Sequence, residues 1–434
     1  MVHVFIVASK GIPAKYGGFE TFVENLTAKK KSSDIYYHVS CMGEPEKHFE
    51  YNNADCFNVK VPLPGAPGRI FHVSRALSQV EDWVREHKGT DEVIVYILGC
   101  RIGPLLIGHS KKLHKLGAKV YCNPDGLEWK RSKWSAPAKK FLKYCEKCLV
   151  TNSDLSICDS VNIEKYIKKS YGVKTTFIAY GADVKESECP ETKLNEWYQK
   201  FKVEKEKYYL IVGRFVPDNN YQTMISEFVK SKTDKDLVII TNVEKNKFYT
   251  DLESKTHFEE DKRVKFVGTV YDQELLKKIR ENAFAYIHGH EVGGTNPSLL
   301  EALASTKVNL LYGIGFNKEV GKSAALYWIK DSGSLAQLIE QTDKDYADSE
   351  KRQQMHEAGM KRVTDAYSWN FIVDEYEKVF LNGGGTTDDV KTSMDSAKSS
   401  VKKEWFCTRR IYKKAWSVWF NWRKLFLSAS VYFT

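Results

Sequence analysis

Long apolar runs are missing from this sequence. In the aromatic C-terminal segment, the longest run without a charge, Leu425 to Thr434, has ten residues, whereas a membrane-spanning helix needs about 20. The opening residues, "MVHVFIVAS", contain no basic region and no cleavage site, and they predict a buried strand in place of a secretory leader. Membrane-spanning and secreted classes are therefore both disfavoured.

The cysteines do not show the spacing pattern of a disulfide framework. Nine are scattered along the chain, which fits a reducing cytosol. Cys145 and Cys148 form a single CxxC in a lysine-rich helical stretch, with no second pair and no nearby histidines. We therefore expect neither a metal site nor a redox centre there.

Two common nucleotide-binding motifs are absent. No GxGxxG follows the first strand, which disfavours a dehydrogenase. The stretch "GIGFNKEVGKS" resembles a Walker loop, but Gly315 lies one residue too far from Gly321, and no strand runs directly into it. A P-loop is not expected.

The composition fits a globular chain, and the distribution of charge gives it a basic C-terminal segment. The 434 residues suit two domains, and 42% hydrophobic content can form sizeable cores. From Lys391 onward there are ten Lys and Arg against two Asp and Glu, so most of the net charge of +10 belongs to this segment. An anionic partner is expected to meet the tail.

Apolar strands alternate with amphipathic helical patterns twice along the chain. The first series includes 3–9, 92–98, 118–124, 149–172 (strand, then helix) and 175–183, and the second includes 208–215, 237–242, 264–270, 283–289 and 308–313. This pattern predicts an α/β fold with two Rossmann-like domains whose strand ends face a central cleft. We expect these parts: an N-terminal domain at 1–180 with a returning helix at 366–381, a second domain at 181–365, a linker at 382–400 and a tail at 401–434.

Two glycine-containing junctions join a strand to a helix and predict anion sites. Gly17 and Gly18 precede one helix, and Gly293, Gly294, Thr295 and Asn296 precede another that starts at Pro297. Helix N-termini carry unpaired amides and partial positive charge, and glycine lets a ligand approach them. Arg214 follows a third strand, and its planar, always charged guanidinium suits a diphosphate. Taken singly, each could be an ordinary turn or surface residue; together they favour a nucleotide diphosphate.

Several strings carry a family likeness. Arg214 in "VGRFVPDNN", "VKFVGTVYDQELL" (264–276), "GGTNPSLLEALA" (293–304) and "YGAD" (180–183) resemble the donor half of family-4 glycosyltransferases of the GT-B fold. "GIPAKYGGFETFVENL" (11–26) and "NPDGLEWKRSKW" (123–134) are similar to its bacterial rhamnosyltransferase branch. The resemblance covers residues 1–381 and implies retaining transfer from a nucleotide sugar without a bound metal or other cofactor.

The resemblance also implies roles for individual residues. Gly17 and Gly18 would face the diphosphate, and Arg214 would bind it. The other expected donor contacts are the amides of Gly294, Thr295 and Asn296 for the sugar, Glu301 for a ribose hydroxyl, and Val270 and Tyr271 for the base.

The sequence departs from the family pattern at two positions. The family has two glutamates eight residues apart, but here Gly293 stands where the first is expected, and Glu291 lies ten residues before Glu301. Asn219 replaces a lysine that follows the arginine, which leaves Arg214 as the main cation on the diphosphate. The contacts that hold the hydroxyl groups of the donor sugar must therefore differ from those of the family.

Asp125, in the turn after a strand, is the expected group that orients or deprotonates the acceptor hydroxyl. It could instead be only the aspartate of an Asp-Gly turn, or the leaving phosphate could act as the base. Glu128, His288 and His290 are weaker candidates.

The segment 401–434 predicts a basic amphipathic helix that lies on an anionic membrane. Ten aromatic residues follow from Trp405, with basic residues on the opposite face. Packing on the body or on a second subunit is the alternative, and nucleic acid is not expected. A second basic stretch, 129–144, could lie beside it on the membrane.

These features predict a peripheral enzyme on the cytoplasmic face of the membrane. It would move L-rhamnose from dTDP-rhamnose to glucose or N-acetylglucosamine on undecaprenyl diphosphate, for capsular or envelope polysaccharide. Another nucleotide sugar such as a UDP-hexose, a non-catalytic membrane adaptor, and a homo-oligomer remain open.

Overall fold

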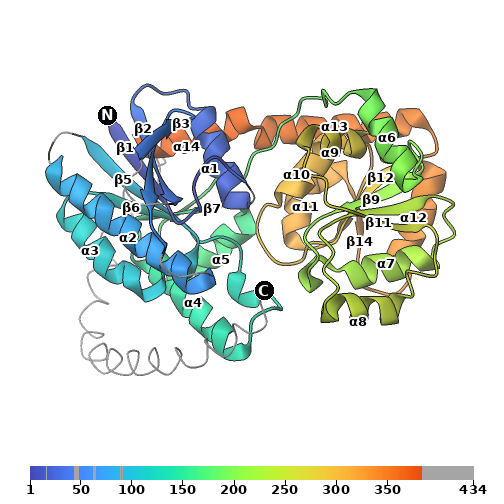
Figure 1. Ribbon diagram of the computed structural model, residues 1–434, viewed down its shortest axis with the longest axis horizontal. Helices are drawn as coiled ribbons and strands as arrows, with labels where there is room; N and C mark the ends of the chain where they lie inside the picture. The colour runs from blue at the N-terminus through green and yellow to red at the C-terminus, as the bar shows by residue number, and fades with distance from the viewer. Residues whose placement is uncertain (16, 44–47, 62–64, 88, 90, 384–434) are drawn as a thin grey trace. The chain divides into compact units, whose positions relative to one another are not determined.

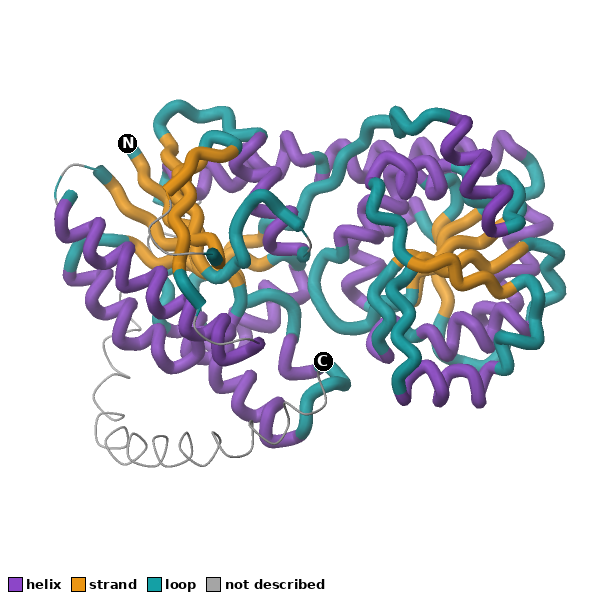
Figure 2. Tube along the Cα trace, in the orientation of Figure 1, coloured by secondary structure: helices purple, strands orange, loops and turns teal. Residues whose placement is uncertain are grey.

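The computed structural model describes residues 1–383 except 16, 44–47, 62–64, 88 and 90. The expected tail at 401–434, and the linker from residue 384 onward, lie outside the described residues. Met1–Leu381 forms one compact unit that contains two sheets, each flanked by helices (Figure 1, Figure 2).

The first sheet has the strand order β3-β4-β2-β1-β5-β6-β7-β8 among the described residues. Its neighbouring strands pair in parallel, except that β3 runs antiparallel to β4. The strands are β1 Val2–Val7, β2 Ile35–Met42, β3 His48–Tyr51, β4 Ala54–Val59, β5 Glu92–Leu98, β6 Lys119–Asn123, β7 Leu155–Cys158 and β8 Thr175–Phe177.

Helices cover both faces of this sheet because its strands are apolar on both sides. In β1, Val4 and Ile6 face one core, and Phe5 and Val7 face the other. The helices of this half are α1 Gly18–Ala28, α2 Gly65–Glu86, α3 Leu106–Lys115, α4 Ala136–Thr151 and α5 Val161–Tyr171, with short 3-10 turns at Cys100–Leu105 and Glu128–Lys130.

The second sheet is parallel throughout, in the order β11-β10-β9-β12-β13-β14. Helices α7, α8 and α12 supply one of its cores, and α6, α9 and α10 supply the other (Figure 1). The strands are β9 Tyr208–Val212, β10 Asp236–Ile240, β11 Val264–Gly268, β12 Ala285–His288, β13 Asn309–Tyr312 and β14 Leu326–Trp328. The helices are α6 Glu191–Phe201, α7 Tyr221–Lys230, α8 Lys247–Thr256, α9 Gln273–Glu281, α10 Pro297–Ser305, α11 Gly315–Gly321, α12 Ser334–Asp345 and α13 Ser349–Tyr367, with 3-10 turns at Pro217–Asn219 and Lys322–Ala324.

The last described helix, α14 Trp369–Leu381, returns to the first sheet. Its Tyr376 hydroxyl lies 3.1 Å from that of Tyr96 on β5. Glu377 accepts hydrogen bonds from the amides of Lys31 (2.8 Å) and Ser32 (2.9 Å). The last described helix therefore packs on the half where the chain begins, while the exact domain boundaries stay a prediction.

The prediction of an α/β fold with two sheets is confirmed; the first sheet is mixed, because β3 runs antiparallel to β4, and two local corrections follow. Residues 149–151 end helix α4 and do not start a strand; β7 begins at Leu155. The hairpin of β3 and β4, together with β2, was not expected, and these strands extend one edge of the first sheet.

The buried cysteines fit a structural role. The eight cysteines in the described part of the chain are free and buried. Burial raises the pKa of the Cys145 thiol to about 12 and also raises the pKa of Cys148. A protonated buried thiol is a poor nucleophile and a poor metal ligand.

Over the described residues, every helix is either too short or too polar to cross a bilayer.

Candidate active site

Parallel strands place all their carboxyl ends at one edge of a sheet, and ligands of open α/β sheets bind there. In the first sheet, Gly17 follows β1, Asp125 follows β6 and Asp159 follows β7. In the second, Arg214 follows β9, Val270 follows β11 and Gly293 follows β12. All of these residues except Asp159 were expected from the sequence, and they follow strand ends, where a ligand is expected.

Gly17 and Gly18 begin α1. Gly17 has φ of 134°, and a Cβ there would overlap the carboxylate of Glu20, so this position requires glycine. A Cβ on Gly18 would meet nothing within 4 Å. The first turn of α1 already holds the Glu20 carboxylate, which accepts a hydrogen bond from the Lys10 amide (2.8 Å). Any anion bound here would share the helix N-terminus with that charge.

The junction between β12 and α10 has the geometry that its sequence predicts. Asn296 caps α10 by accepting a hydrogen bond from the Ser298 amide (2.9 Å), and Pro297 occupies the first turn. Leu299, Leu300 and Leu303 are buried and anchor the helix. Gly293 has φ of 152°, and a Cβ there would lie 2.8 Å from His290 Nε2. No side chain fits at position 293.

Arg214 is exposed, and no carboxylate among the described residues pairs with its guanidinium. Asn219 fixes the backbone beneath it, donating from Nδ2 to the Arg214 carbonyl oxygen (2.7 Å). Asn219 Oδ1 lies 2.9 Å from Nδ1 of His290. Asn219 therefore links the loop after β9 to the loop after β12, a role that its sequence position did not predict.

Both histidines of this region are uncharged at neutral pH. Burial lowers the pKa of His288 to about 3, with a smaller effect of His290. Burial, followed by the charges of Arg131 and Arg214, lowers the pKa of His290 to about 3. Arg214, like Arg131, is therefore close enough to the loop that contains Gly293 to influence His290.

Glu301 lies on α10 and is 40% exposed, so it can meet a ligand. The guanidinium of Arg280, which is buried, lies 2.6 Å from its carboxylate. This contact orients the carboxylate of Glu301. Glu291 is engaged elsewhere, with Lys330 at 2.6 Å and Asn220 at 3.3 Å, which supports the view that it does not replace the missing glutamate.

Asp125 adopts a left-handed conformation with φ of 64°. Its amide donates to Asn123 Oδ1 (2.8 Å), and its own Oδ1 accepts from the Gly126 amide (2.7 Å). Burial raises the pKa of this carboxyl, and the nearby Arg131 guanidinium opposes the rise. The residue is both a turn former and a desolvated carboxylate, so geometry alone leaves both predicted roles open.

Glu128, a weaker candidate, is buried and already paired. Its carboxylate contacts Arg131 at 2.5 Å and Lys133 at 3.0 Å, and it accepts from Trp134 Nε1 at 3.1 Å. Desolvation opposes ionisation of Glu128, but the two cations prevail and lower its pKa. These bonds favour a structural role in the turn that carries Asp125.

The loops after β6 and β7 contact the loop after β12. A Cβ on Gly126 would lie 2.5 Å from the Cα of Gly293. Thr295 donates its hydroxyl proton to the carbonyl oxygen of Asp159, and a Cβ on Gly294 would overlap the Asp159 carboxyl group. Glycine at 126 and 294 is therefore required by this close approach.

Asp159 was missed by the sequence reasoning. It is 2% exposed, and its Oδ1 has no hydrogen-bond partner among the described residues. Burial, then the charge of Asp125, raises its pKa well above the usual range. The signal was an aspartate directly after the strand "LSIC", the same arrangement that singled out Asp125.

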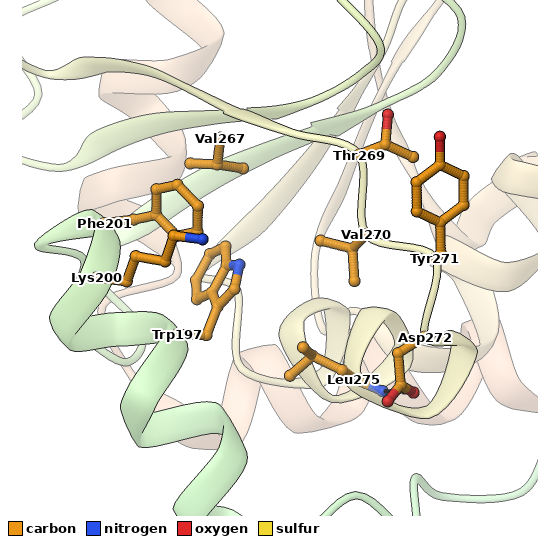
Figure 3. A pocket seen from close by; sticks show the side chains of 9 residues that line it. All are labelled: Trp197, Lys200, Phe201, Val267, Thr269, Val270, Tyr271, Asp272 and Leu275. Carbon is orange, nitrogen blue, oxygen red and sulfur yellow. Dashed lines mark hydrogen bonds between the residues drawn. The ribbon is translucent and has the colours of Figure 1, made fainter.

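Val270 and Tyr271 line a pocket of about 260 Å³ beside the edge strand β11 (Figure 3). Its other walls come from α6, β11 and the start of α9: Trp197, Lys200, Phe201, Val267, Thr269, Asp272 and Leu275. Tyr271 is 79% exposed. The two residues expected near the base thus border this pocket.

Solved structures share this architecture. Sucrose-phosphate synthase from Thermosynechococcus elongatus is similar over 88% of this chain and 98% of its own, with a TM-score of 0.65 and 14% identity. The chain is also similar to a glycosyltransferase from Rickettsia africae ESF-5, with a TM-score of 0.65 and 13% identity over 88% of this chain and 98% of that one. It is similar as well to Anabaena HepE in complex with UDP, with a TM-score of 0.64 and 12% identity over 88% of this chain and 100% of that one. The fold is GT-B.

Family models divide the chain between them. Residues 195–362 match the model described as glycosyl transferases group 1, and residues 1–183 match a domain of unknown function, DUF1972. None of the curated proteins matches the sequence. With the fold, the match over 195–362 defines the protein as a glycosyltransferase of the GT-B type.

Proposed function

We propose that this glycosyltransferase moves L-rhamnose from dTDP-rhamnose to glucose or N-acetylglucosamine on a lipid diphosphate, with retention and without a bound metal or other cofactor. One arrangement carries the proposal. The unpaired guanidinium of Arg214 lies near the N-terminal loop of α10, through Asn219 and His290, and the turn of Asp125 approaches the same loop from the first sheet. A sugar diphosphate could then bind on one side and an acceptor hydroxyl on the other.

The rhamnose assignment rests on the resemblance of residues 11–26 and 123–134 to the rhamnosyltransferase branch. A nucleotide-sugar donor is also supported by similar structures, which include HepE with UDP and an E. coli trehalose-6-phosphate structure bound with UDP-2-fluoro glucose. A UDP-hexose is therefore the second candidate donor.

Two arginines on the first half support a phosphate-bearing acceptor. Arg69 lies on α2, and Arg101 follows β5. Burial lowers the pKa of Arg69, and the charge of Arg101 lowers it further. Nε of Arg69 has no hydrogen-bond partner within the described part of the chain. Arg101 also affects the pKa of Asp125, so an acceptor diphosphate bound here would bring its sugar near that carboxylate.

A matrix of donors and acceptors tests the proposal. The donors are dTDP-rhamnose, dTDP-glucose, UDP-glucose and UDP-N-acetylglucosamine; the acceptors are short-chain prenyl diphosphates with glucose or N-acetylglucosamine. We expect transfer only from dTDP-rhamnose, and weaker transfer to the same sugars without diphosphate. Transfer from a UDP-hexose would instead support the second donor, and neither transfer nor donor hydrolysis would support the non-catalytic adaptor.

We further propose that residues 401–434 hold the enzyme on the cytoplasmic face of an anionic membrane. Aromatic and basic residues occupy opposite faces of the expected helix. In the described part, Lys140, Lys143 and Lys147 on α4 are exposed, and Phe141 is 47% exposed, so the first half offers a second basic surface.

Deletion of residues 401–434 is expected to release the enzyme from anionic vesicles, because each basic residue near such a surface contributes about 1 kcal/mol. Activity on a soluble acceptor should persist. Cosedimentation with vesicles that contain anionic lipid measures the loss, and neutral vesicles are the control. Unchanged binding to anionic vesicles would show that the tail is not the anchor; a changed oligomeric state would favour packing on a second subunit.

A further inference from the structure

Asp159, the residue directly after β7, packs against the loop that precedes α10. A Cβ on Gly294 would overlap all three atoms of the Asp159 carboxyl group, so this group lies directly on the Cα of Gly294. The backbone carbonyl oxygen of Asp159 accepts the hydroxyl proton of Thr295. Two consecutive residues of the loop are thus held by a single residue of the first half.

The carboxyl group of Asp159 has no positively charged partner. It is 2% exposed, and its Oδ1 lacks a hydrogen-bond partner among the described residues. The charges that act on it are those of Asp125 and Glu319, and both are negative. Glu319, on α11, accepts hydrogen bonds from the Ser160 hydroxyl (2.9 Å) and the Val161 amide (2.8 Å). Because a carboxylate buried without a cation is very costly, this environment favours a protonated Asp159.

The turn that carries Asp125 reaches the same loop from the neighbouring strand β6. A Cβ on Gly126 would lie 2.5 Å from the Cα of Gly293 and 3.2 Å from the nitrogen of Gly294. Burial, then the charge of Asp125, raises the pKa of Asp159 well above its usual range, so Asp125 ionises first. The loop therefore contacts two turns whose carboxyl groups differ in charge at neutral pH.

We infer that Asp159 is a positioning residue for sugar transfer, and that its uncharged carboxyl group holds the loop 293–296 where the loop amides can meet the donor sugar. Ionisation of Asp159 would place a buried anion against Gly294, in addition to the charge of Asp125, and would loosen the loop. The inference rests on the proposed function in one respect, namely that this loop holds the donor. It does not depend on which sugar is transferred.

Three other titratable groups face Asp159. Tyr180 follows β8, Tyr376 lies on α14, and Cys158 ends β7. Burial raises the pKa of each of them above its ordinary value, with a smaller effect of Asp159. All three are therefore uncharged at neutral and mildly alkaline pH. A loss of activity in this range that depends on residue 159 reports Asp159 itself.

The pH profile of kcat/KM for dTDP-rhamnose tests the inference. The wild-type value should fall as the pH rises through the raised pKa of Asp159, because the protonated form positions the loop. Asp159→Asn, which has an uncharged group of the same shape, should lose this alkaline fall. Asp159→Ala should lower kcat/KM at neutral pH about 10-fold or more, since small misplacements of a bound sugar slow transfer strongly. Asparagine should recover most of that loss.

Glu146→Gln is the matched control. Glu146 on α4 is also 2% exposed, but its carboxylate accepts from the hydroxyl groups of Tyr166 (2.6 Å) and Tyr171 (2.6 Å), which belong to α5. This variant should keep the alkaline fall. The same alkaline fall in wild type and Asp159→Asn would overturn the inference, as would a wild-type kcat/KM in Asp159→Ala.

Unfolding of the protein without donor gives an independent measurement. A carboxyl group whose pKa is raised by folding destabilises the folded state as the pH rises from about 4, where the unfolded aspartate ionises. Urea denaturation should therefore show wild type losing stability relative to Asp159→Asn between pH 4 and pH 8. A difference that is equal at both pH values would overturn the inference. Failure of the rhamnose proposal is seen separately, in the donor preference of the wild-type enzyme.

Discussion

Replacing Arg214 by alanine is expected to lower kcat/KM for sugar transfer by about 100-fold or more. The charge of Arg214 influences His290 in the loop before α10, as does that of Arg131, and a lysine that the family has nearby is replaced here by Asn219. Fixed charge aimed at a leaving diphosphate stabilises the transition state more than the ground state. Initial rates at varied donor concentration measure the effect.

The fold of that variant should be intact, since Arg214 is exposed and its guanidinium has no ion-pair partner among the described residues. An unchanged melting temperature checks this. Arg214→Lys should recover only part of the rate, because lysine keeps the charge and loses the two-pronged geometry. Arg85→Ala, at an exposed arginine of α2, is the control. Turnover of Arg214→Ala close to wild type would remove Arg214 from the site.

The parallel strands of the two sheets were predictable because they are short and apolar. β5 coincides with the expected 92–98, and β9 to β13 lie within a few residues of the expected strands. In such sheets the burial of both faces leaves a continuous apolar run in the sequence. Ligands of such sheets bind at the strand ends, which is why Asp125, Arg214 and the glycine junction of α10 were candidates from the sequence.

The hairpin of β3 and β4 shows what the alternation pattern alone misses. Asn52 and Asn53 both have positive φ, at 45° and 57°, as a two-residue turn between antiparallel strands requires. Paired asparagines between "HFEY" and "ADCFNV" were a readable turn signal. The pattern of alternating strands and helices does not include such an antiparallel pair.

Contacts between residues distant in sequence could not be predicted from the sequence. Nothing local marks Arg280 as the partner of Glu301, or Thr295 as the donor to the Asp159 carbonyl, because each pair is brought together only by the packing of separate elements. The same holds for Trp197, whose place in the pocket depends on how α6 lies beside β11. The spacing of apolar residues predicts where strands end. Tertiary packing determines which side chains of other elements contact those ends.

The largest remaining effect is expected from Asp125→Asn, which should lower the rate of transfer to the lipid acceptor about 10²–10⁴-fold. Asparagine tolerates the left-handed conformation and can still accept from the Gly126 amide, so the turn should survive. Donor affinity should stay unchanged, since the substitution removes only the group that takes up the acceptor proton. Single-turnover transfer at saturating donor measures the loss.

The pH profile separates a base from a turn former. A carboxylate acts as a base only when ionised, and burial raises the pKa of Asp125. The wild-type rate should therefore rise as pH increases through that raised pKa, and Asp125→Asn should lose this rise. Asp183→Asn, at an exposed aspartate, is the control and should keep it. If Asp125→Asn retains the wild-type rate and profile, Asp125 is only a turn residue, and the leaving phosphate of the donor becomes the group that accepts the proton.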